Sequence, residues 1–262
     1  MKTIVLGKGF LGKKFEEAGF EVWGRDRFEM NYFDEGICYG DKLRDLDVII
    51  NCMAKSNTRW CEKPENFHEA LWSNGTIPRL LSGYCKANGK KFVHISTGCL
   101  YDSHKWNQYG EEEKLTAHCN YTVSKWVGEQ GCRPEHDLVI RPRLLFGDFQ
   151  DRNNLLCKLP AFTRYVDRFN SFSSVNVVVE AVTALLEHNQ SGVFNVACDG
   201  AATVWTLAQW MGLEGQPMTE RHLHEAEGIF LVNNVMDLTK LKQFYMPPTL
   251  KDEVLRCWKA IQ

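Results

Sequence analysis

Short apolar runs alternate with longer amphipathic stretches along the first 200 residues of the chain. The apolar runs are rich in β-branched residues, and several are apolar at nearly every position, as in Asp47-Val48-Ile49-Ile50. Continuous runs of this kind are typical of parallel strands that helices cover on both faces. The pattern predicts strands at 3–7, 20–24, 47–51, 91–97, 138–143 and 193–197, and helices near 10–18, 66–88, 119–131 and 175–187.

This alternation of strands and helices predicts an α/β fold with a doubly wound parallel sheet of the Rossmann type. After Gly147 the pattern changes, because residues 147–172 are polar and aromatic without a clean period. Two further helices are expected at 203–211 and 250–260. We therefore expect one sheet domain in residues 1–147, a small cap formed by 148–172 and 198–262, and a return to the sheet in 173–197.

The charge balance and the lengths of the apolar runs argue against nucleic-acid-binding and membrane-spanning proteins. The chain has 262 residues, with 31 Lys+Arg against 33 Asp+Glu and no basic block, which argues against a nucleic-acid partner. No apolar run approaches the roughly 18–20 residues of a membrane span, and the run at 3–6 is too short for the core of a signal peptide. We therefore expect a cytoplasmic protein with no membrane partner.

The ten cysteines are dispersed, and none of them forms a Cys-x-x-Cys motif. In a cytoplasmic chain, dispersed cysteines are usually reduced and behave as small hydrophobic residues. His222 and His224 lie two residues apart without other ligands at the spacing that zinc sites use, so no metal is expected.

A glycine-rich turn joins the first strand to the first helix. Its sequence, Gly7-Lys8-Gly9-Phe10-Leu11-Gly12, has the spacing Gly-x-Gly-x-x-Gly. In this context the first glycine permits a tight turn, the second lets a pyrophosphate approach the backbone, and the third lets helix and strand pack closely. The helix amino terminus then faces the negative charge. We expect Gly7, Gly9, Phe10, Leu11 and Gly12 to bind a dinucleotide cofactor.

The residues after the second strand bear on the choice of cofactor. Asp26 could bind ribose hydroxyls, as acidic residues do in NAD sites. Arg25 and Arg27 flank it, and a guanidinium matches the charge of a 2′-phosphate. Two arginines against one aspartate favour NADP(H), with NAD(H) as the alternative.

Candidate catalytic residues lie on one predicted helix and at the end of one predicted strand. Tyr121 and Lys125 are four residues apart and therefore share a helix face. A nearby ammonium favours the phenolate of a tyrosine, which can then exchange a proton with a carbonyl. Ser96 and Thr97 end the fourth strand, at the edge where such sheets bind ligands. A hydroxyl there can orient a substrate carbonyl.

These motifs together resemble the extended short-chain dehydrogenase/reductase family. The resemblance implies that Thr97, Tyr121 and Lys125 form a catalytic triad and that Lys125 also binds the nicotinamide ribose. Within this family the chain is most similar to the dTDP-4-dehydrorhamnose reductases, in the stretches Val48-Ile49-Ile50-Asn51, Ser73-Asn74-Gly75-Thr76, His94-Ile95-Ser96-Thr97 and Gly192-Val193-Phe194-Asn195-Val196.

The same resemblance implies further contacts with the cofactor and the substrate. Asn51 and the following residues, including Met53 and Ala54, are expected to line the cofactor, and Glu29 and Met30 to contact its adenine. Substrate contacts are expected from a set near the strand ends and in the cap, namely Ser96, Thr97, Arg143 and Asn154. The small cap would then be a substrate-binding cap.

A narrower similarity links the chain to bifunctional nucleotide-rhamnose synthase 3,5-epimerase/4-reductases. It is carried by Trp60-Cys61-Glu62, Ser96-Thr97-Gly98-Cys99, Arg141-Pro142-Arg143 and Asn153-Asn154-Leu155-Leu156-Cys157-Lys158. The resemblance implies that Cys99 and Lys158 act in epimerisation at carbons 3 and 5, since a thiol and an amine can remove and return protons next to a keto group. The open alternatives are a packed thiol at Cys99 and, at Lys158, a solvated lysine or a pyrophosphate contact.

The sequence thus predicts an NAD(P)-dependent oxidoreductase that reduces a 4-keto-6-deoxy sugar nucleotide of the dTDP- or UDP-4-dehydrorhamnose type, with or without 3,5-epimerase activity. The expected partners are the nucleotide-sugar substrate and, as one option, a second copy in a homodimer. Two other functions stay open. One is a sugar-nucleotide 4-epimerase that keeps NAD bound. The other is a non-catalytic NADP-binding regulatory subunit, such as the one that methionine adenosyltransferase has.

Overall fold

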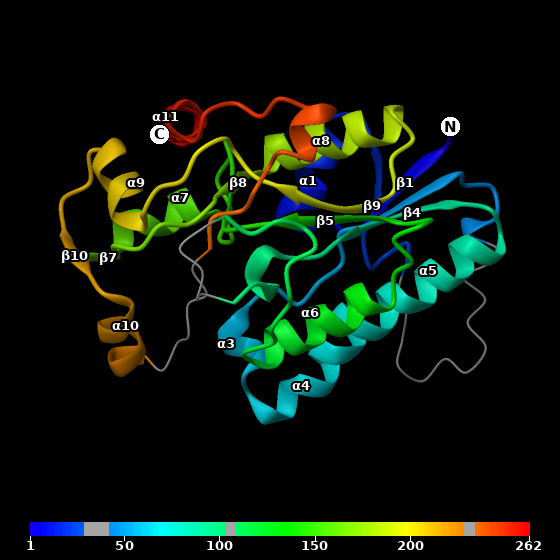
Figure 1. Cartoon of the computed structure of the whole chain (residues 1–262), viewed down its shortest axis with the longest axis horizontal. Helices are drawn as coiled ribbons and strands as arrows, with labels where there is room; N and C mark the ends of the chain where they lie inside the picture. Colours follow the sequence, from blue (N-terminus) through cyan, green and yellow to red (C-terminus); the bar gives the residue numbers. More distant parts are fainter. Residues whose placement is uncertain (29–41, 103–107, 228–233) are drawn as a thin grey trace. The chain divides into compact units, whose positions relative to one another are not determined.

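A computed structural model describes residues 1–28, 42–102, 108–227 and 234–262 (Figure 1). The chain forms two compact units, one comprising Met1–Thr97, Ala117–Ile140 and Asn189–Val193, and the other Gly98–Thr116, Arg141–His188 and Phe194–Gln262. These boundaries differ from the expected sheet domain and cap. Residues 98–116 group with the second unit because Tyr101 and Tyr109 pack in a buried cluster with Ala197, Met236 and Leu238.

All six predicted strands are present in one parallel sheet, in the order β2-β1-β3-β4-β5-β9. They are β1 (Thr3–Leu6), β2 (Glu21–Trp23), β3 (Val48–Asn51), β4 (Lys91–Ile95), β5 (Leu138–Pro142) and β9 (Gly192–Val196). Ile4 pairs with Glu21 on one side and Ile49 on the other, so the sheet grows in opposite directions from β1. The strand order therefore reverses at the carboxyl end of β1, which is where open α/β sheets bind ligands.

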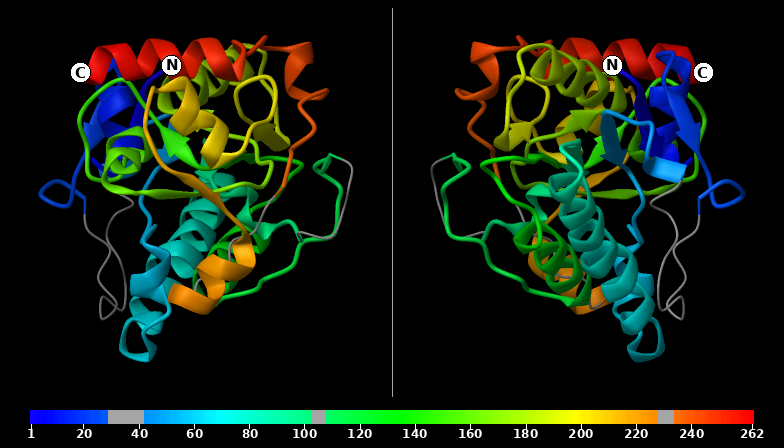
Figure 2. Two further views of the ribbon diagram at one scale, coloured as in Figure 1. Left: turned by 90° about the vertical axis from the view of Figure 1, so that its left-hand side faces the viewer. Right: turned by 90° about the vertical axis from the view of Figure 1, so that its right-hand side faces the viewer.

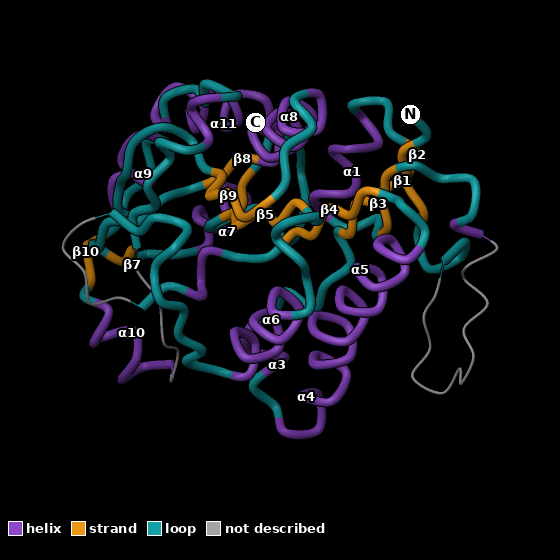
Figure 3. The backbone as a smooth tube through the Cα atoms, turned by 45° about the vertical axis from the view of Figure 1, so that its right-hand side comes forward, coloured by secondary structure: helices purple, strands orange, loops and turns teal. Residues whose placement is uncertain are grey.

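Helices cover both faces of the sheet in the first unit. The helix α1 (Phe10–Glu17) lies on one face, and α5 (Ile77–Ala87) and α6 (Asn120–Gln130) lie on the other (Figure 3). A hydrophobic cluster of buried side chains fills the core between the sheet and α5, among them Ile4, Ile49, Leu81, Phe92 and Val139. The predicted α/β sheet is thereby confirmed.

The structure has three consecutive helical segments where the sequence predicted a single helix at 66–88, and they follow one another without a break (Figure 2). They are α4 (Pro64–Leu71), a π-helical turn η1 (Trp72–Thr76) and α5. Pro78 explains the wide turn, because a proline has no N–H and its ring crowds the carbonyl four residues earlier. That carbonyl belongs to Asn74, and it lies directly against Gly128 of α6, where an added Cβ would be 2.0 Å from it.

The second unit contains short strands, the three helices predicted after residue 147 and several further helical segments. The predicted helices correspond to α8 (Val175–Glu187), α9 (Val204–Trp210) and α11 (Leu250–Ile261). Two small parallel pairs join β6 (Leu145–Phe146) to β8 (Ser173–Ser174) and β7 (Arg164–Val166) to β10 (Gln216–Met218). Further helical segments of the described chain were not predicted from the sequence: α3 (Thr58–Cys61), η2 (Gly98–Leu100), α7 (Leu155–Lys158), η3 (Leu159–Ala161), α10 (Glu220–Glu227) and η4 (Leu241–Gln243).

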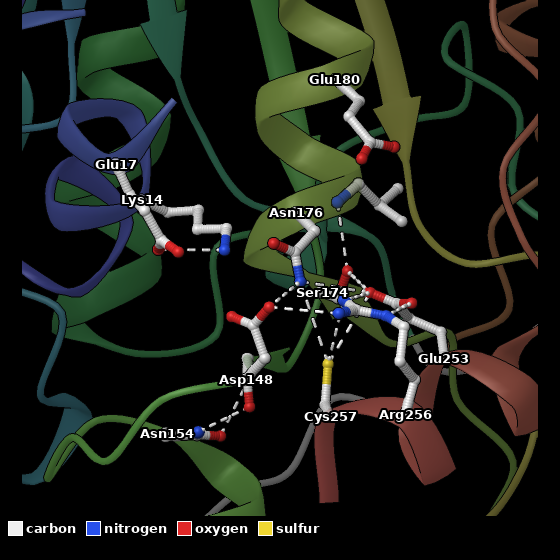
Figure 4. Close-up of polar contacts among 12 residues, drawn as sticks. Lys14, Glu17, Asp148, Asn154, Ser174, Asn176, Glu180, Glu253, Arg256 and Cys257 are labelled. Carbon is white, nitrogen blue, oxygen red and sulfur yellow. Dashed lines mark hydrogen bonds and ion pairs between the residues drawn. The ribbon is translucent and has the colours of Figure 1, made fainter. Parts of the chain in front are cut away.

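A buried polar network joins α11 to the amino terminus of α8 (Figure 4). The hydroxyl of Ser174 caps α8 by accepting from Val177 N at 3.1 Å and donates to Glu253 at 2.6 Å. Arg256 binds both oxygens of Glu253 at 2.8 Å and contacts Asp148 at 3.2 Å. A buried carboxylate needs such partners, so this network fixes α11 to α8.

Within the described residues, we find no helix with both the length and the apolar character needed to cross a bilayer.

The close approach of α6 to η1 predicts opposite effects for two Gly→Ala substitutions within helices. At Gly128 the new Cβ would meet the backbone oxygen of Asn74, which no side-chain rotation can relieve, so Gly128→Ala should destabilise the protein by about 1–3 kcal/mol. At Gly83 of α5 an added Cβ meets nothing within 4 Å, and Gly83→Ala should stabilise it by about 0.5–1 kcal/mol. Urea unfolding of both variants measures the two effects, and shifts in the same direction would contradict this packing.

Candidate active site

The glycine-rich turn fits the pyrophosphate of a dinucleotide. Gly7 has φ +107° and an added Cβ would lie 2.8 Å from Met53 N, while at Gly12 it would lie 1.9 Å from the Gly7 oxygen. At Gly9 an added Cβ meets nothing within 4 Å, so this position faces open space. Gly9 is also the N-cap of α1 and has no side chain to occupy the first N–H groups. These groups can therefore bind an anion. Phe10 and Leu11, the first residues of α1, are buried.

The two arginines after β2 differ in their contacts with other side chains. Arg25, Asp26 and Arg27 are all exposed. Arg27 pairs with Glu21 at 3.2 Å and lies over the Trp23 ring at 5.4 Å, whereas Arg25 forms no ion pair with any described residue. The Arg27 guanidinium is thus engaged with Glu21 and Trp23, and the Arg25 side chain is exposed. Glu29 and Met30, expected at the adenine, lie outside the described residues.

The end of β3 lies beside the glycine turn. Asn51 is fully buried, and its side-chain oxygen accepts from Met53 N at 3.1 Å. Its amide nitrogen lies 3.4 Å from Nδ1 of His94 on β4. Met53 N is the atom that an added Cβ on Gly7 would meet, and the exposed Ala54 follows it. The structure therefore brings Asn51 and Met53 to the same edge of the sheet as the glycine turn.

The Lys125 side chain joins α6 to the end of β4. Lys125 is 2% exposed, and its Nζ donates to the Ile95 carbonyl at 2.7 Å. Thr97 follows two residues later and is also buried, while Tyr121 is half-buried one helical turn before Lys125. Because all three candidate catalytic residues belong to the first unit, the contact places the helix of Tyr121 and Lys125 against the strand that leads to Thr97.

The charge at this edge comes from Lys125 and not from the neighbouring histidine. Burial holds the pKa of His94 well below its ordinary value, and the Lys125 ammonium lowers it further. His94 is therefore neutral at physiological pH and serves as a hydrogen-bonding partner of Asn51.

Two side chains distant in sequence hold α6 in place. Asn74 in η1 accepts from Lys55 N at 2.7 Å and donates to Ser124 of α6 at 2.9 Å. Glu62 accepts from the backbone N–H groups of Asn120 and Tyr121 at 3.2 Å each, at the first turn of α6. Negative charge at a helix amino terminus is stabilising. No local pattern indicates this role of Glu62, since the contact joins residues 58 positions apart.

The structure places the Ser96 hydroxyl against α6. It donates to Glu129 at 2.5 Å, and both residues are buried. From the sequence, Ser96 is expected among the substrate contacts, and no motif indicates Glu129. The available signal was its position four residues after Lys125, on the same helix face.

In the second unit, Cys99 and Arg143 contact each other. Arg143 is 4% exposed; its Nη1 donates to Cys99 Sγ at 2.8 Å and its Nη2 to Asn170 at 3.1 Å. Cys99 is half-buried. The guanidinium expected to bind substrate is therefore engaged with a thiol and an amide.

Asn154 and Lys158 lie at opposite ends of α7. Asn154 is fully buried, and its side chain caps α7 through Leu156 N at 3.1 Å and also binds Gly147 and Phe149. Lys158 is exposed, yet desolvation by the surrounding chain lowers its pKa from the ordinary value against the opposing effect of Asp151. A lowered pKa increases the fraction of neutral amine, which is the form that acts as a base.

Two curated relatives align with about three-fifths of the chain. One is a probable low-salt glycan biosynthesis reductase of Haloferax volcanii, 28% identical over 61% of this chain and 56% of the relative. The other is a dTDP-4-keto-6-deoxy-D-glucose reductase of Streptomyces niveus, 28% identical over 62% of this chain and 58% of the relative. The chain thus spans little more than half the length of these relatives.

The fold has close structural counterparts. The dTDP-4-dehydrorhamnose reductase of Bacillus anthracis, solved in complex with NADP, superposes with a TM-score of 0.83 at 18% identity and covers 99% of both chains. The family model described as the RmlD substrate binding domain matches residues 1–216. The glycine turn, the sheet and the helix of Tyr121 and Lys125 all fall within that match, and the chain belongs to the RmlD substrate binding domain family.

Proposed function

We propose that this protein is an oxidoreductase that reduces the 4-keto group of a 6-deoxy sugar nucleotide of the dTDP- or UDP-4-dehydrorhamnose type, with NADPH preferred over NADH. The observation that carries this proposal is the 2.7 Å bond from Lys125 Nζ to the Ile95 carbonyl, which sets the helix of Tyr121 against the strand that leads to Thr97. The names of the relatives support the substrate class, and the NADP complex of the Bacillus anthracis reductase supports the cofactor.

Each residue of the site has a distinct task in this reaction. The glycine turn would hold the pyrophosphate of NADPH and Arg25 its 2′-phosphate, and the bound nicotinamide supplies the hydride that adds to C4. Thr97 donates a hydrogen bond to the C4 oxygen and orients the carbonyl. Tyr121 transfers its proton to that oxygen as the negative charge develops, so that an alcohol is formed. Lys125 stabilises the phenolate that remains on Tyr121.

Removal of the Tyr121 hydroxyl tests this mechanism. Tyr121→Phe should lower kcat for the 4-keto-6-deoxy sugar nucleotide by about 10²–10⁴, the usual contribution of a positioned acid. NADPH binding should persist, because the glycine turn is unchanged. Loss of NADPH absorbance measures turnover, and cofactor fluorescence measures binding. The matched control is Tyr84→Phe on α5, which should leave kcat unchanged.

Other results would identify one of the alternative functions. Oxidation of NADPH that is slower than that of NADH would contradict the cofactor preference. Tightly held NAD with no net oxidation of added NADPH would indicate a 4-epimerase. A stable enzyme partner, with no turnover of any keto sugar, would indicate a regulatory subunit.

We also propose that the chain epimerises its substrate at carbons 3 and 5 through Cys99 and Lys158. Two features of the second unit support this. Cys99 is half-buried, and the guanidinium of Arg143 lies 2.8 Å from its sulfur. The lowered pKa of Lys158 favours the neutral amine. A proton removed from C3 or C5 by one group and returned by the other inverts that carbon without any net oxidation.

Epimerisation in D₂O would label the product. The wild-type protein with NADPH and dTDP- or UDP-4-keto-6-deoxyglucose should place deuterium at C3 and C5, as measured by NMR of the product. Cys99→Ala and Lys158→Met should abolish this label but still reduce a substrate that a separate epimerase has processed. Cys157→Ala, next to Lys158, serves as the control and should label normally. Label that arises only after a separate epimerase is added would disprove the epimerase proposal and leave the reductase intact.

A further inference from the structure

We propose that Ser96 and Glu129 form a positioning couple, which fixes the end of β4, and with it Thr97, against the helix that carries Tyr121 and Lys125. The effect on turnover rests on the proposed reductase function. The couple itself is defined by contacts within the first unit.

The contact between them is short and buried. The Ser96 Oγ donates to Oε2 of Glu129 at 2.5 Å, and the two residues are 4% and 6% exposed. A carboxylate at this depth needs hydrogen-bond donors, because water does not solvate it there. Glu129 therefore holds Ser96 by a charge-assisted bond, the stronger class of hydrogen bond.

Glu129 continues the catalytic face of α6. Tyr121, Lys125 and Glu129 follow at intervals of four residues, so they lie along one stripe of the helix. Lys125 binds the carbonyl of Ile95, and Glu129 binds the side chain of the next residue, Ser96. Two consecutive residues at the end of β4 are thus held by two charged groups one helical turn apart.

The same strand end is held from its other side by β5. Ser96 N donates to the Ile140 carbonyl at 2.7 Å. Ser96 is therefore attached through both its backbone and its side chain, and Thr97 is the next residue along. The position of the Thr97 hydroxyl relative to Tyr121 follows from these attachments, and small displacements of a catalytic group can cost large factors in rate.

The couple also excludes one role for Ser96. A hydroxyl has a single proton to donate. Since the Ser96 proton is directed to Glu129, it does not also reach a substrate carbonyl. This leaves the orienting hydrogen bond of the proposed mechanism to Thr97 and makes Ser96 a positioning residue.

The chain offers a matched control for this couple. Ser82 on α5 donates to Asp137 at 2.6 Å, both residues are buried, and both belong to the same unit. Arg133 also donates to Ser82 at 2.9 Å and to Asp137 at 2.8 Å, and this pair holds neither the end of β4 nor the catalytic face of α6. Ser82→Ala therefore reports the cost of losing a buried serine–carboxylate bond together with the bond from Arg133.

The test compares Ser96→Ala, Glu129→Gln, the double variant and Ser82→Ala in the full chain. Both single variants should lower kcat by about ten- to a hundredfold with KM for the sugar nucleotide nearly unchanged. The double variant should be no worse than the poorer single one, because both changes break the same contact. Ser82→Ala should lower the melting temperature similarly and leave kcat unchanged.

Hydrogen–deuterium exchange gives a second readout that needs no turnover. Exchange across residues 95–100 should become about tenfold faster in Ser96→Ala and Glu129→Gln but not in Ser82→Ala, since only the first two release the strand end. Unchanged exchange there would overturn the inference. So would a raised KM with normal kcat in Ser96→Ala, which would make Ser96 a substrate contact. If the variants show this exchange pattern while the wild-type protein reduces no 4-keto sugar nucleotide, the proposed function alone is refuted and the couple is supported.

Discussion

The buried ammonium of Lys125 is the constraint on which the rest of the first unit depends. An ion withdrawn from water costs several kcal/mol unless polar groups replace its hydration. The Ile95 carbonyl is one such group, and it can serve only while α6 lies against the end of β4. A shift of the helix by one turn would leave the charge without this partner. The sheet edge and the helix are therefore fixed relative to each other before any ligand binds.

The backbone packing of α6 allows this arrangement. Gly75 and Gly128 let η1 and α6 approach until backbone meets backbone, and Pro78 widens the turn so that Asn74 faces α6. The Asn74 amide then ties the loop after β3 to Ser124. The segment that borders the glycine turn and the helix that carries the candidate acid are thus parts of one continuous hydrogen-bonded framework.

The strands of the sheet, the glycine turn and the helix of Tyr121 and Lys125 could be predicted from local sequence. The apolar runs located all six strands of the sheet, because covered parallel strands are continuously apolar. The glycine spacing and the Tyr121/Lys125 spacing were visible because a turn and a helix face are defined by a few consecutive residues. The π turn at Asn74 was missed because the periodicity of 66–88 runs through it. Partners such as Glu62 for Tyr121 N–H, or Glu253 for Ser174, are invisible to any local pattern, since the fold joins segments 59 and 79 residues apart.

The hydrogen bonds of the Asn154 side chain affect how mutations at this position are interpreted. Its side-chain oxygen accepts from Gly147 and Leu156, and its nitrogen donates to Gly147 and Phe149. An amide has two donors and about two acceptor sites, so the side chain is saturated by its own backbone. A scan of inactive variants would rank this asparagine with the residues that touch the sugar. Its loss would also release the loop and the start of α7, so a loss of activity at this position would report local folding as well as any contact with the sugar.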